Sequence, residues 1–202
     1  PQIFAIDVNT IQGKTASFGM NNQETFVNNL SVDSNGNGLY KRINKNRTLT
    51  VYLIKNLLEG EISINELDKY LDTMEVVNAP NFSTHNLVVD KNGNIYVVEP
   101  GRGNIKNKKQ ESPYFVMTNF SLIDYNNGKK YNDNGFDRYE KVNTELKKAK
   151  KINVKDAFKI LEKVKQDCEW KTEFSMVYSQ KNKTIYYCYN SKLFVFIRGI
   201  RL

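Results

Sequence analysis

The sequence predicts a layered α+β fold built from antiparallel sheets. Strand-like segments occur in runs, and pairs of helical segments stand between those runs. The tight-turn sequence Lys-Asn-Gly at 91–93 joins two strand-like segments and is typical of a β-hairpin. The regular strand–helix–strand alternation that builds parallel sheets is missing from the pattern. These observations favour strands joined by hairpins and covered by paired helices.

Three strands are expected at the start of the chain. Residues 3–8 and 15–20 flank a turn at Gly13, and residues 24–32 alternate between apolar and polar side chains. The chain opens inside the first of these strand-like patterns. We therefore expect the true N-terminus to lie upstream of Pro1.

Two consecutive helices are expected next. In residues 47–60, leucines recur at helical spacing and Gly60 stands where a C-cap glycine belongs. Residues 63–74 begin with Ser63 and Glu66, which have the spacing of a capping box.

A β-meander is expected after these helices. Residues 84–90 and 94–100 form the hairpin, and residues 114–120, Tyr-Phe-Val-Met-Thr-Asn-Phe, are expected to form the next strand. That strand would end in Thr118 and Asn119. Asparagine is depleted in strands and costs free energy when it is buried without a partner. The presence of Asn119 at this position therefore needs an explanation.

In the last third of the chain, two expected helices are again followed by expected strands. The second helix is expected to be capped by Asn153. With 202 residues, the whole chain, 1–202, is expected to be a single domain. The expected helices span 137–150 and 153–167, and the expected strands span 173–179, 184–190 and 192–197.

The composition excludes several classes of protein. Hydrophobic residues make up 40% of the chain, which is enough for a globular core. The net charge of +8 suggests an anionic partner, but the basic residues are spread out and no nucleic-acid-binding motif accompanies them. The lysine-rich run at 147–151 ends a helix, where it complements the helix dipole. No apolar run reaches the length of a membrane span. We expect neither a nucleic-acid nor a membrane partner.

The cysteines and the single histidine do not form a recognisable catalytic or metal-binding motif. Cys168 and Cys188 match no zinc or redox spacing, and we expect free buried thiols in a reducing, cytoplasmic compartment. His85 would have to serve any site of the Ser-His-Asp or Cys-His kind, yet no nucleophile motif lies near it. We expect His85 to have an ordinary packing role or to lie at the surface. No metal and no cofactor are expected.

A loop after the third strand resembles a calcium-binding loop only in part. Residues 33–38, Asp-Ser-Asn-Gly-Asn-Gly, copy the first six positions of such a loop. The twelfth position is Asn44, where a bidentate glutamate is required, and no helix precedes the loop. We expect a turn here.

Several weak signals become informative when they are taken together. A Gly-x-Asn closes an early strand, a hairpin ends in Val-Glu, a Thr-Asn follows, an arginine opens a helix, and a last hairpin closes the chain. In order, these segments are 18–23, 85–99, 115–120, 136–141 and 173–190.

This ordered set resembles the N-terminal-nucleophile hydrolases that act on linear amides. That group includes choloylglycine hydrolase, penicillin V acylase and acyl-coenzyme A:aminopenicillanate acyltransferase. The resemblance extends over residues 17–190. The short gap between Asn119 and Arg138 is more similar to the acyltransferase-like branch than to the bile-salt branch.

The resemblance implies a fold and an activity. The implied fold is a four-layer αββα sandwich, in which two antiparallel sheets pack face to face with a helix pair on each outside, here incomplete at the N-terminus. The implied activity is hydrolysis or acyl transfer on a small-molecule linear amide, by attack of a cysteine thiolate and formation of an acyl-enzyme.

The resemblance also implies roles for three residues. Asn119 would donate its side-chain amide to the oxyanion of the tetrahedral intermediate, Arg138 would help to organise the site, and Asn21 would lie near it. Each residue has a simpler interpretation. Asn119 would cap a turn, Arg138 would form an exposed salt bridge, and Asn21 would be a turn residue.

The departures from the family pattern leave the activity open. The family's nucleophile is a cysteine that becomes the first residue after processing, whereas this chain starts with Pro1, and the family's early arginine and aspartate are absent. Residues 21–25 also lack the family's usual glutamate and glycine. We expect an enzyme seen without its N-terminal segment, with which it would associate, or a relative that lost the nucleophile and serves as a binding or partner protein. Homo-oligomerisation stays open.

Overall fold

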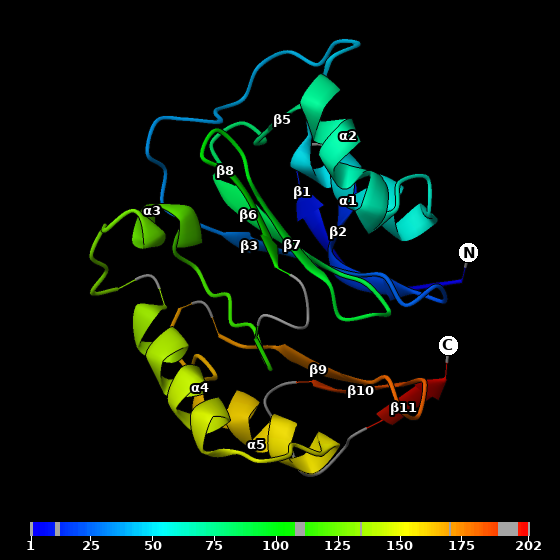
Figure 1. Ribbon diagram of the computed structural model, residues 1–202, viewed down its shortest axis with the longest axis vertical. Helices are drawn as coiled ribbons and strands as arrows, with labels where there is room; N and C mark the ends of the chain where they lie inside the picture. The colour runs from blue at the N-terminus through cyan, green and yellow to red at the C-terminus, as the bar shows by residue number, and fades with distance from the viewer. Residues whose placement is uncertain are drawn as a thin grey trace. The chain divides into compact units, whose positions relative to one another are not determined.

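The protein was analysed as a computed structural model that describes residues 2–10, 13–107, 112–133, 135–169, 171–189 and 198–201 (Figure 1). The chain forms two compact units, Pro1–Phe136 and Asp137–Leu202. Each unit has its own antiparallel sheet and its own helices.

The first unit is built on a six-stranded sheet in which every neighbouring pair is antiparallel. The predicted hairpin at its centre is confirmed, and Gly93 takes a φ of 79° in the turn, a conformation that glycine adopts at little cost. The strands, in sheet order, are β1 (Ile3–Thr10), β2 (Gly13–Asn21), β3 (Phe26–Ser31), β6 (Thr84–Val89), β7 (Ile95–Glu99) and β8 (Gly103–Asn107).

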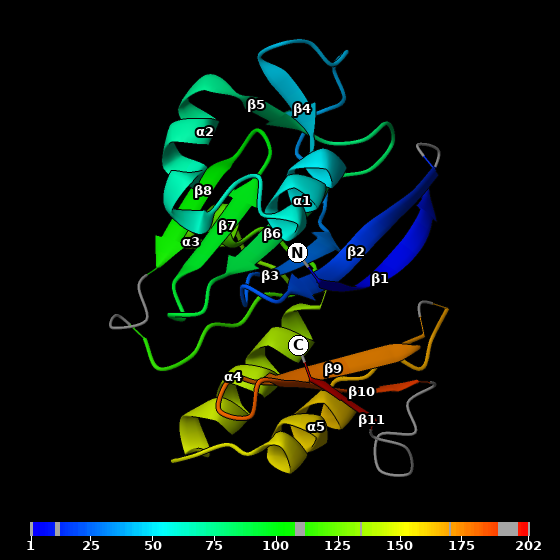
Figure 2. The ribbon, with the colours of Figure 1, turned by 90° about the vertical axis from the view of Figure 1, so that its right-hand side faces the viewer.

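The predicted helix pair covers one face of this sheet (Figure 2). It consists of α1 (Thr50–Glu59), the short 3₁₀ helix η1 (Ile64–Glu66) and α2 (Leu67–Thr73). The leucine stripe of α1 packs against Val27 and Val88 of the sheet in one hydrophobic cluster. Both predicted end signals are present, since Gly60 ends α1 with a φ of 74° and Ser63 forms a capping box with Glu66.

The prediction that the first helix begins at residue 47 is wrong by three residues. Residues Arg47–Leu49 form strand β4, which pairs in parallel with β5 (Glu75–Val77). The Arg47 Nε donates to Glu75 Oε2 at 2.7 Å, and Leu49 is buried against Val77. These contacts join residues on opposite sides of the helix pair, so helical spacing alone did not reveal them.

The prediction of a strand over residues 114–120 is also wrong. Residues 114–118 belong to no helix or strand, and the edge position beside β7 is taken by β8. The sequence of β8, Gly-Asn-Ile-Lys-Asn, is poor in strand-favouring residues, whereas Phe-Val-Met is rich in them. Strand propensity reflects how well a side chain fits a half-buried surface. Residues 114–118 are partly or fully buried without pairing in a sheet, so they meet that preference in another way. The short helix α3 (Leu122–Asn126) follows.

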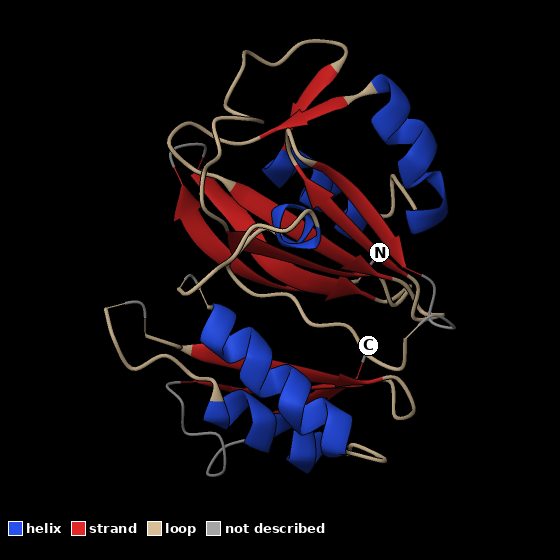
Figure 3. Ribbon diagram, turned by 60° about the vertical axis from the view of Figure 1, so that its left-hand side comes forward, coloured by secondary structure: helices blue, strands red, loops and turns tan. Residues whose placement is uncertain are grey.

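The second unit has two helices on the same side of a three-stranded antiparallel sheet (Figure 3). Phe158 of helix α5 (Val154–Lys163) and Cys188 of the central strand form its buried centre. Asn153 caps α5 as predicted, in a capping box with Asp156. The predicted strand at 192–197 lies outside the described residues. The elements are α4 (Phe136–Lys148), α5 (Val154–Lys163), β9 (Phe174–Ser179), β10 (Thr184–Tyr189) and β11 (Arg198–Arg201).

The predicted fold class is confirmed in its coarser form. Apart from the small β4–β5 pair, the described strands are antiparallel, and each unit has a helix pair that covers one face of its sheet. The stacking of the two sheets into four layers stays a prediction. No helix among the described residues has the length and apolar character needed to cross a membrane.

Candidate functional site

Asn119 lies beside the end of strand β3. Its side-chain Nδ2 donates a hydrogen bond to the carbonyl oxygen of Ser31, the last residue of β3, at 3.0 Å. The residue is half-buried and follows an irregular segment rather than a strand. The prediction that Asn119 ends a strand of its own is wrong, and its side chain instead binds the end of β3.

A buried pair of ionisable residues lies next to this segment. His85 is 0% exposed and Glu99 is 1% exposed. The His85 Nδ1 lies 3.1 Å from Glu99 Oε1, and the His85 Nε2 lies 2.7 Å from the carbonyl oxygen of Thr118. Of the two positions expected for His85, packing inside the fold or a place at the surface, the structure shows the first, with polar neighbours. No local pattern in the sequence indicates this pair, because its members are 14 positions apart on different strands.

Glu99 is the centre of a wider set of hydrogen bonds. Its Oε1 accepts the backbone N–H of Leu122 at 2.8 Å, and its Oε2 accepts the Ser121 hydroxyl. Burial alone would raise the pKa of the Glu99 carboxyl, but the hydrogen bonds from His85 and Ser121, the charge of His85 and the Leu122 N–H hold that pKa below its usual value. Glu99 is therefore ionised at neutral pH.

Asn21 has a different set of partners. It is 0% exposed, and its Nδ2 donates to the carbonyl oxygens of Leu57 and Leu58 at 3.4 and 3.0 Å. Its Oδ1 accepts the backbone N–H groups of Gln23 and Thr25, both at 3.0 Å. Asn21 thus joins the last turn of α1 to the β2–β3 turn, which favours the simpler interpretation as a turn residue.

Arg138 opens helix α4, as the sequence predicts, and its side chain is half-buried. It belongs to the second unit, whereas Asn119 and Asn21 belong to the first. Its part in organising a site with Asn119 stays a prediction.

The two thiols differ from each other. Cys188 is buried as predicted, and burial raises the pKa of its thiol. Cys168 is exposed, which corrects the prediction of two buried thiols. Cys168 lies between α5 and β9 rather than inside a layer of the fold, so no packing covers it. Among the described residues, no group of three or more His, Cys, Asp or Glu side chains could hold a metal ion.

In the loop that partly resembles a calcium site, the carboxylate of Asp33 binds protein side chains. Asp33 accepts hydrogen bonds from Lys129 Nζ and from the Tyr131 hydroxyl, and Arg102 binds its carbonyl oxygen. The Lys129 ammonium group pairs with the carboxylate that a calcium ion would need as a ligand, which disfavours a calcium site. The loop bends at residues 36 and 38, and Asp33 ties it to the segment after α3.

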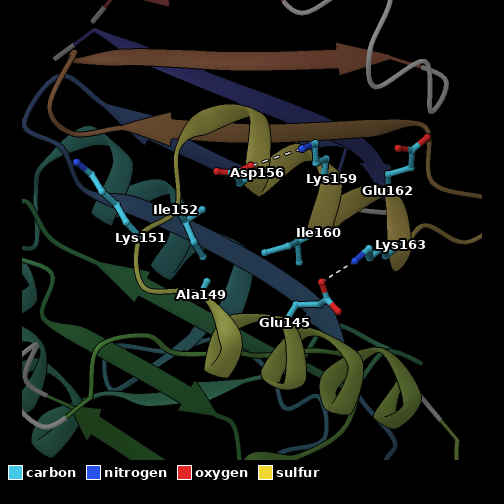
Figure 4. A pocket seen from close by; sticks show the side chains of 9 residues that line it. All are labelled: Glu145, Ala149, Lys151, Ile152, Asp156, Lys159, Ile160, Glu162 and Lys163. Atoms are coloured by element: carbon cyan, nitrogen blue, oxygen red, sulfur yellow. Dashed lines mark hydrogen bonds and ion pairs between the residues drawn. The ribbon is translucent and has the colours of Figure 1, made fainter.

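One cavity of about 310 Å³ lies within the second unit, between the end of α4 and α5 (Figure 4). The Lys163–Glu145 ion pair at 2.6 Å joins α5 to α4 beside the cavity, and the Lys159–Asp156 pair at 3.7 Å lies within α5. Its lining contains no cysteine, serine, threonine or histidine, so it offers no nucleophile. The lining residues are Glu145, Ala149, Lys151, Ile152, Asp156, Lys159, Ile160, Glu162 and Lys163.

Comparison with known proteins gives matches at the level of structure. No family model and no curated protein matches this sequence. A cysteine-to-alanine mutant of conjugated bile acid hydrolase from Clostridium perfringens matches with a TM-score of 0.71 at 15% identity, over 99% of this chain and 76% of that one. An arginine-to-leucine variant of the same hydrolase matches with a TM-score of 0.65 at 16% identity, over 98% of this chain and 76% of that one.

Penicillin V acylase from Agrobacterium tumefaciens also matches. Its TM-score is 0.68 at 15% identity, over 93% of this chain and 66% of that one. At these identities the likeness is one of fold. The resemblance predicted from the sequence is thus confirmed as a structural match over nearly the whole chain to this group of hydrolases.

Proposed function

We propose that this chain carries the oxyanion-binding part of an enzyme that hydrolyses small linear amides, or transfers their acyl group. The bond cleaved is a non-peptide C–N bond, and the attacking group is the thiolate of an N-terminal cysteine outside these 202 residues. The observation that carries the proposal is the Asn119 amide, fixed at the end of β3 in a fold shared with bile acid and penicillin V amidases.

The chemistry assigned to Asn119 is donation to a developing negative charge. Attack of the thiolate on the amide carbonyl converts the carbonyl oxygen into an oxyanion. A side-chain amide N–H aimed at that oxygen stabilises the transition state by roughly 3–4 kcal/mol. The α-amino group of that N-terminal cysteine, which took the proton from the thiol, passes it to the leaving nitrogen. Collapse of the intermediate then breaks the C–N bond and releases the amine, and water or another amine accepts the acyl group from sulfur. The anchor at Ser31 restricts how the Asn119 amide can rotate.

The cysteines within the chain do not fit the role of nucleophile. The raised pKa of the Cys188 thiol keeps it protonated at neutral pH, and its 1% exposure leaves a substrate no access. Cys168 is accessible but is not an N-terminal residue, so its own α-amino group cannot act as the base. Arg138, at the start of α4, would orient the substrate or the nucleophile segment.

The same observation about the cysteines favours a second candidate function. A chain of this fold that carries no competent nucleophile would bind an amide, or a partner protein, without cleaving it. The Asn119 amide would then donate to the carbonyl oxygen of a bound ligand, where the charge is smaller than on an oxyanion.

The two functions are separated by the gene sequence upstream of the codon for Pro1, followed by one assay. A cysteine codon, with arginine and aspartate codons some residues later, favours the enzyme. The longer protein would then be incubated with penicillin V, conjugated bile salts and N-acyl amino acids, and amine release measured. Turnover that disappears when that cysteine becomes alanine supports the proposal, whereas ligand binding without turnover supports the binding protein.

A further inference from the structure

We infer that the buried His85–Glu99 pair is a positioning device that holds the backbone on both sides of Asn119. The inference deepens the proposed function and rests on it for the importance of Asn119. His85 and Glu99 are positioning residues, and neither would touch the substrate.

The pair lies on the sheet face that is turned away from α1 and α2. Val88 of β6 and Val98 of β7 belong to the cluster beneath those helices. Because side chains alternate along a strand, His85 and Glu99 point to the opposite face. The register that pairs Asn86 with Val98 places the two residues side by side on neighbouring strands.

The pair holds the segment at two points. On the N-terminal side of Asn119, His85 Nε2 donates to the Thr118 carbonyl oxygen at 2.7 Å. On the C-terminal side, Glu99 accepts the Ser121 hydroxyl and the Leu122 N–H, the latter at 2.8 Å. Residues 114–118 belong to no helix or strand, so side chains provide the hydrogen bonds to the backbone that a neighbouring strand would provide in a sheet.

The hydrogen bond to Thr118 defines which ring nitrogen of His85 donates. A carbonyl oxygen only accepts, so His85 Nε2 carries a proton toward Thr118. The other ring nitrogen, Nδ1, lies 3.1 Å from Glu99 Oε1, so the ring bridges the Thr118 carbonyl and the Glu99 carboxyl group.

The third point of support is the Asn119 side chain itself. Ser31 pairs with Thr84, and Leu30 pairs with His85, so the carbonyl that Asn119 binds is next to the start of β6. The backbone beside Asn119 and the Asn119 side chain are thus both hydrogen-bonded to the same part of the sheet, where the end of β3 pairs with the start of β6. A shift of about 1 Å in such a group can cost roughly 100-fold in rate.

The first test uses the unmodified chain. His85 is the only histidine, so the ring signals of protein labelled with ¹⁵N-histidine need no assignment. We expect a slowly exchanging proton on Nε2 and, with ¹³C at the Thr118 carbonyl, a coupling across the hydrogen bond from Nε2–H to that carbon. A ring that exchanges quickly with solvent and shows no such coupling would overturn the inference without any mutation.

The second test measures hydrogen–deuterium exchange in the variants His85→Gln and Glu99→Gln. Exchange in residues 118–122 should rise by about tenfold or more, while α1 exchanges as in the wild type. Val88→Ala is the matched control, because it lies on the same strand as His85 but faces the helices. Its effect should not be concentrated in residues 118–122. Unchanged exchange of residues 118–122 in folded His85→Gln would refute the positioning role.

The third test separates this inference from the proposed function. In the longer protein with turnover, His85→Gln should lower kcat by about 10–100-fold with little change in KM. It should cause no further loss in an Asn119→Ala background, since its effect passes through Asn119. An additive loss would contradict the inference. If Asn119→Ala leaves kcat unchanged, the proposed function fails, whereas the exchange experiment still decides whether His85 and Glu99 hold the segment.

Discussion

The Asn119 side-chain nitrogen lies 3.0 Å from the Ser31 carbonyl oxygen, and this hydrogen bond spans 88 positions of the sequence. It connects an irregular segment to the end of a central strand. The first prediction depends on what that amide does beyond this bond.

In the longer protein with turnover, Asn119→Ala should lower kcat by about 10²–10³-fold and leave KM nearly unchanged. An oxyanion contact strengthens only as charge develops, so its loss appears in the chemical step. Stability should change by about 1 kcal/mol, the usual net value of one hydrogen bond. Steady-state kinetics and urea unfolding measure both quantities. Unchanged kcat with a large loss of stability would mean that Asn119 is a structural cap.

Asn21→Ala should have the opposite profile, with a loss of about 3 kcal/mol of stability. The substitution leaves the buried Leu58 carbonyl and the N–H groups of Gln23 and Thr25 without their partner. Urea unfolding of this chain measures the effect. Asn22→Ala is a suitable control, because Asn22 is the exposed neighbour in the same turn. A stable Asn21→Ala protein that loses turnover would instead restore Asn21 to the catalytic site.

The 202-residue chain should not hydrolyse penicillin V, conjugated bile salts or N-acyl amino acids. With a thiol reagent, Cys168 should react at once, and Cys188 should react about 100-fold more slowly or only after unfolding, because it is buried and its thiol pKa is raised. Mass spectrometry of the labelled protein identifies the modified residue. Turnover by this chain that is abolished by Cys168→Ala or Cys188→Ala would show that a thiol within it is the nucleophile.

The Asp33–Lys129 contact should make stability depend on acid pH. Burial alone would raise the pKa of the Asp33 carboxyl, but the hydrogen bond and charge of Lys129, with Arg102 and Tyr131, lower it below its usual value. Because the folded pKa is lower than the unfolded pKa of about 3.9, the stabilisation is present above that value and is lost as the pH falls through the folded pKa.

Asp33→Asn should therefore be less stable than the wild type by a constant amount from about pH 5 to 8, and the difference should shrink below about pH 4. Urea unfolding across this range measures it. Lys129→Gln should flatten the wild-type dependence in the same way, since it removes the partner. A difference that persists undiminished at about pH 2.5 would show that Asp33 acts through its shape and not its charge.

The sequence by itself determined the features that depend on near neighbours along the chain. The Gly60 helix end, the Ser63 and Asn153 capping boxes and the Gly93 hairpin were all predictable. Each involves residues within about four positions, so its physical cause is present in a short stretch of sequence. The ordered set of weak motifs also predicted the fold that the solved structures share.

Only the tertiary structure decided which residues meet across the sheet. Residues 114–118 have strand-favouring side chains, but β8 occupies the position beside β7, so residues 114–118 lie outside the sheet. The Thr118 carbonyl is bound by the His85 side chain instead of by a neighbouring strand. Asn21 lies in a motif that suggested a catalytic site, yet its partners are the carbonyls at the end of α1. In both cases a buried polar group needs a hydrogen bond, and one of the partners that it finds is more than 30 positions away in sequence. The conformational preferences of a short segment cannot specify such a partner, because the two residues come close together only when the whole sheet has formed.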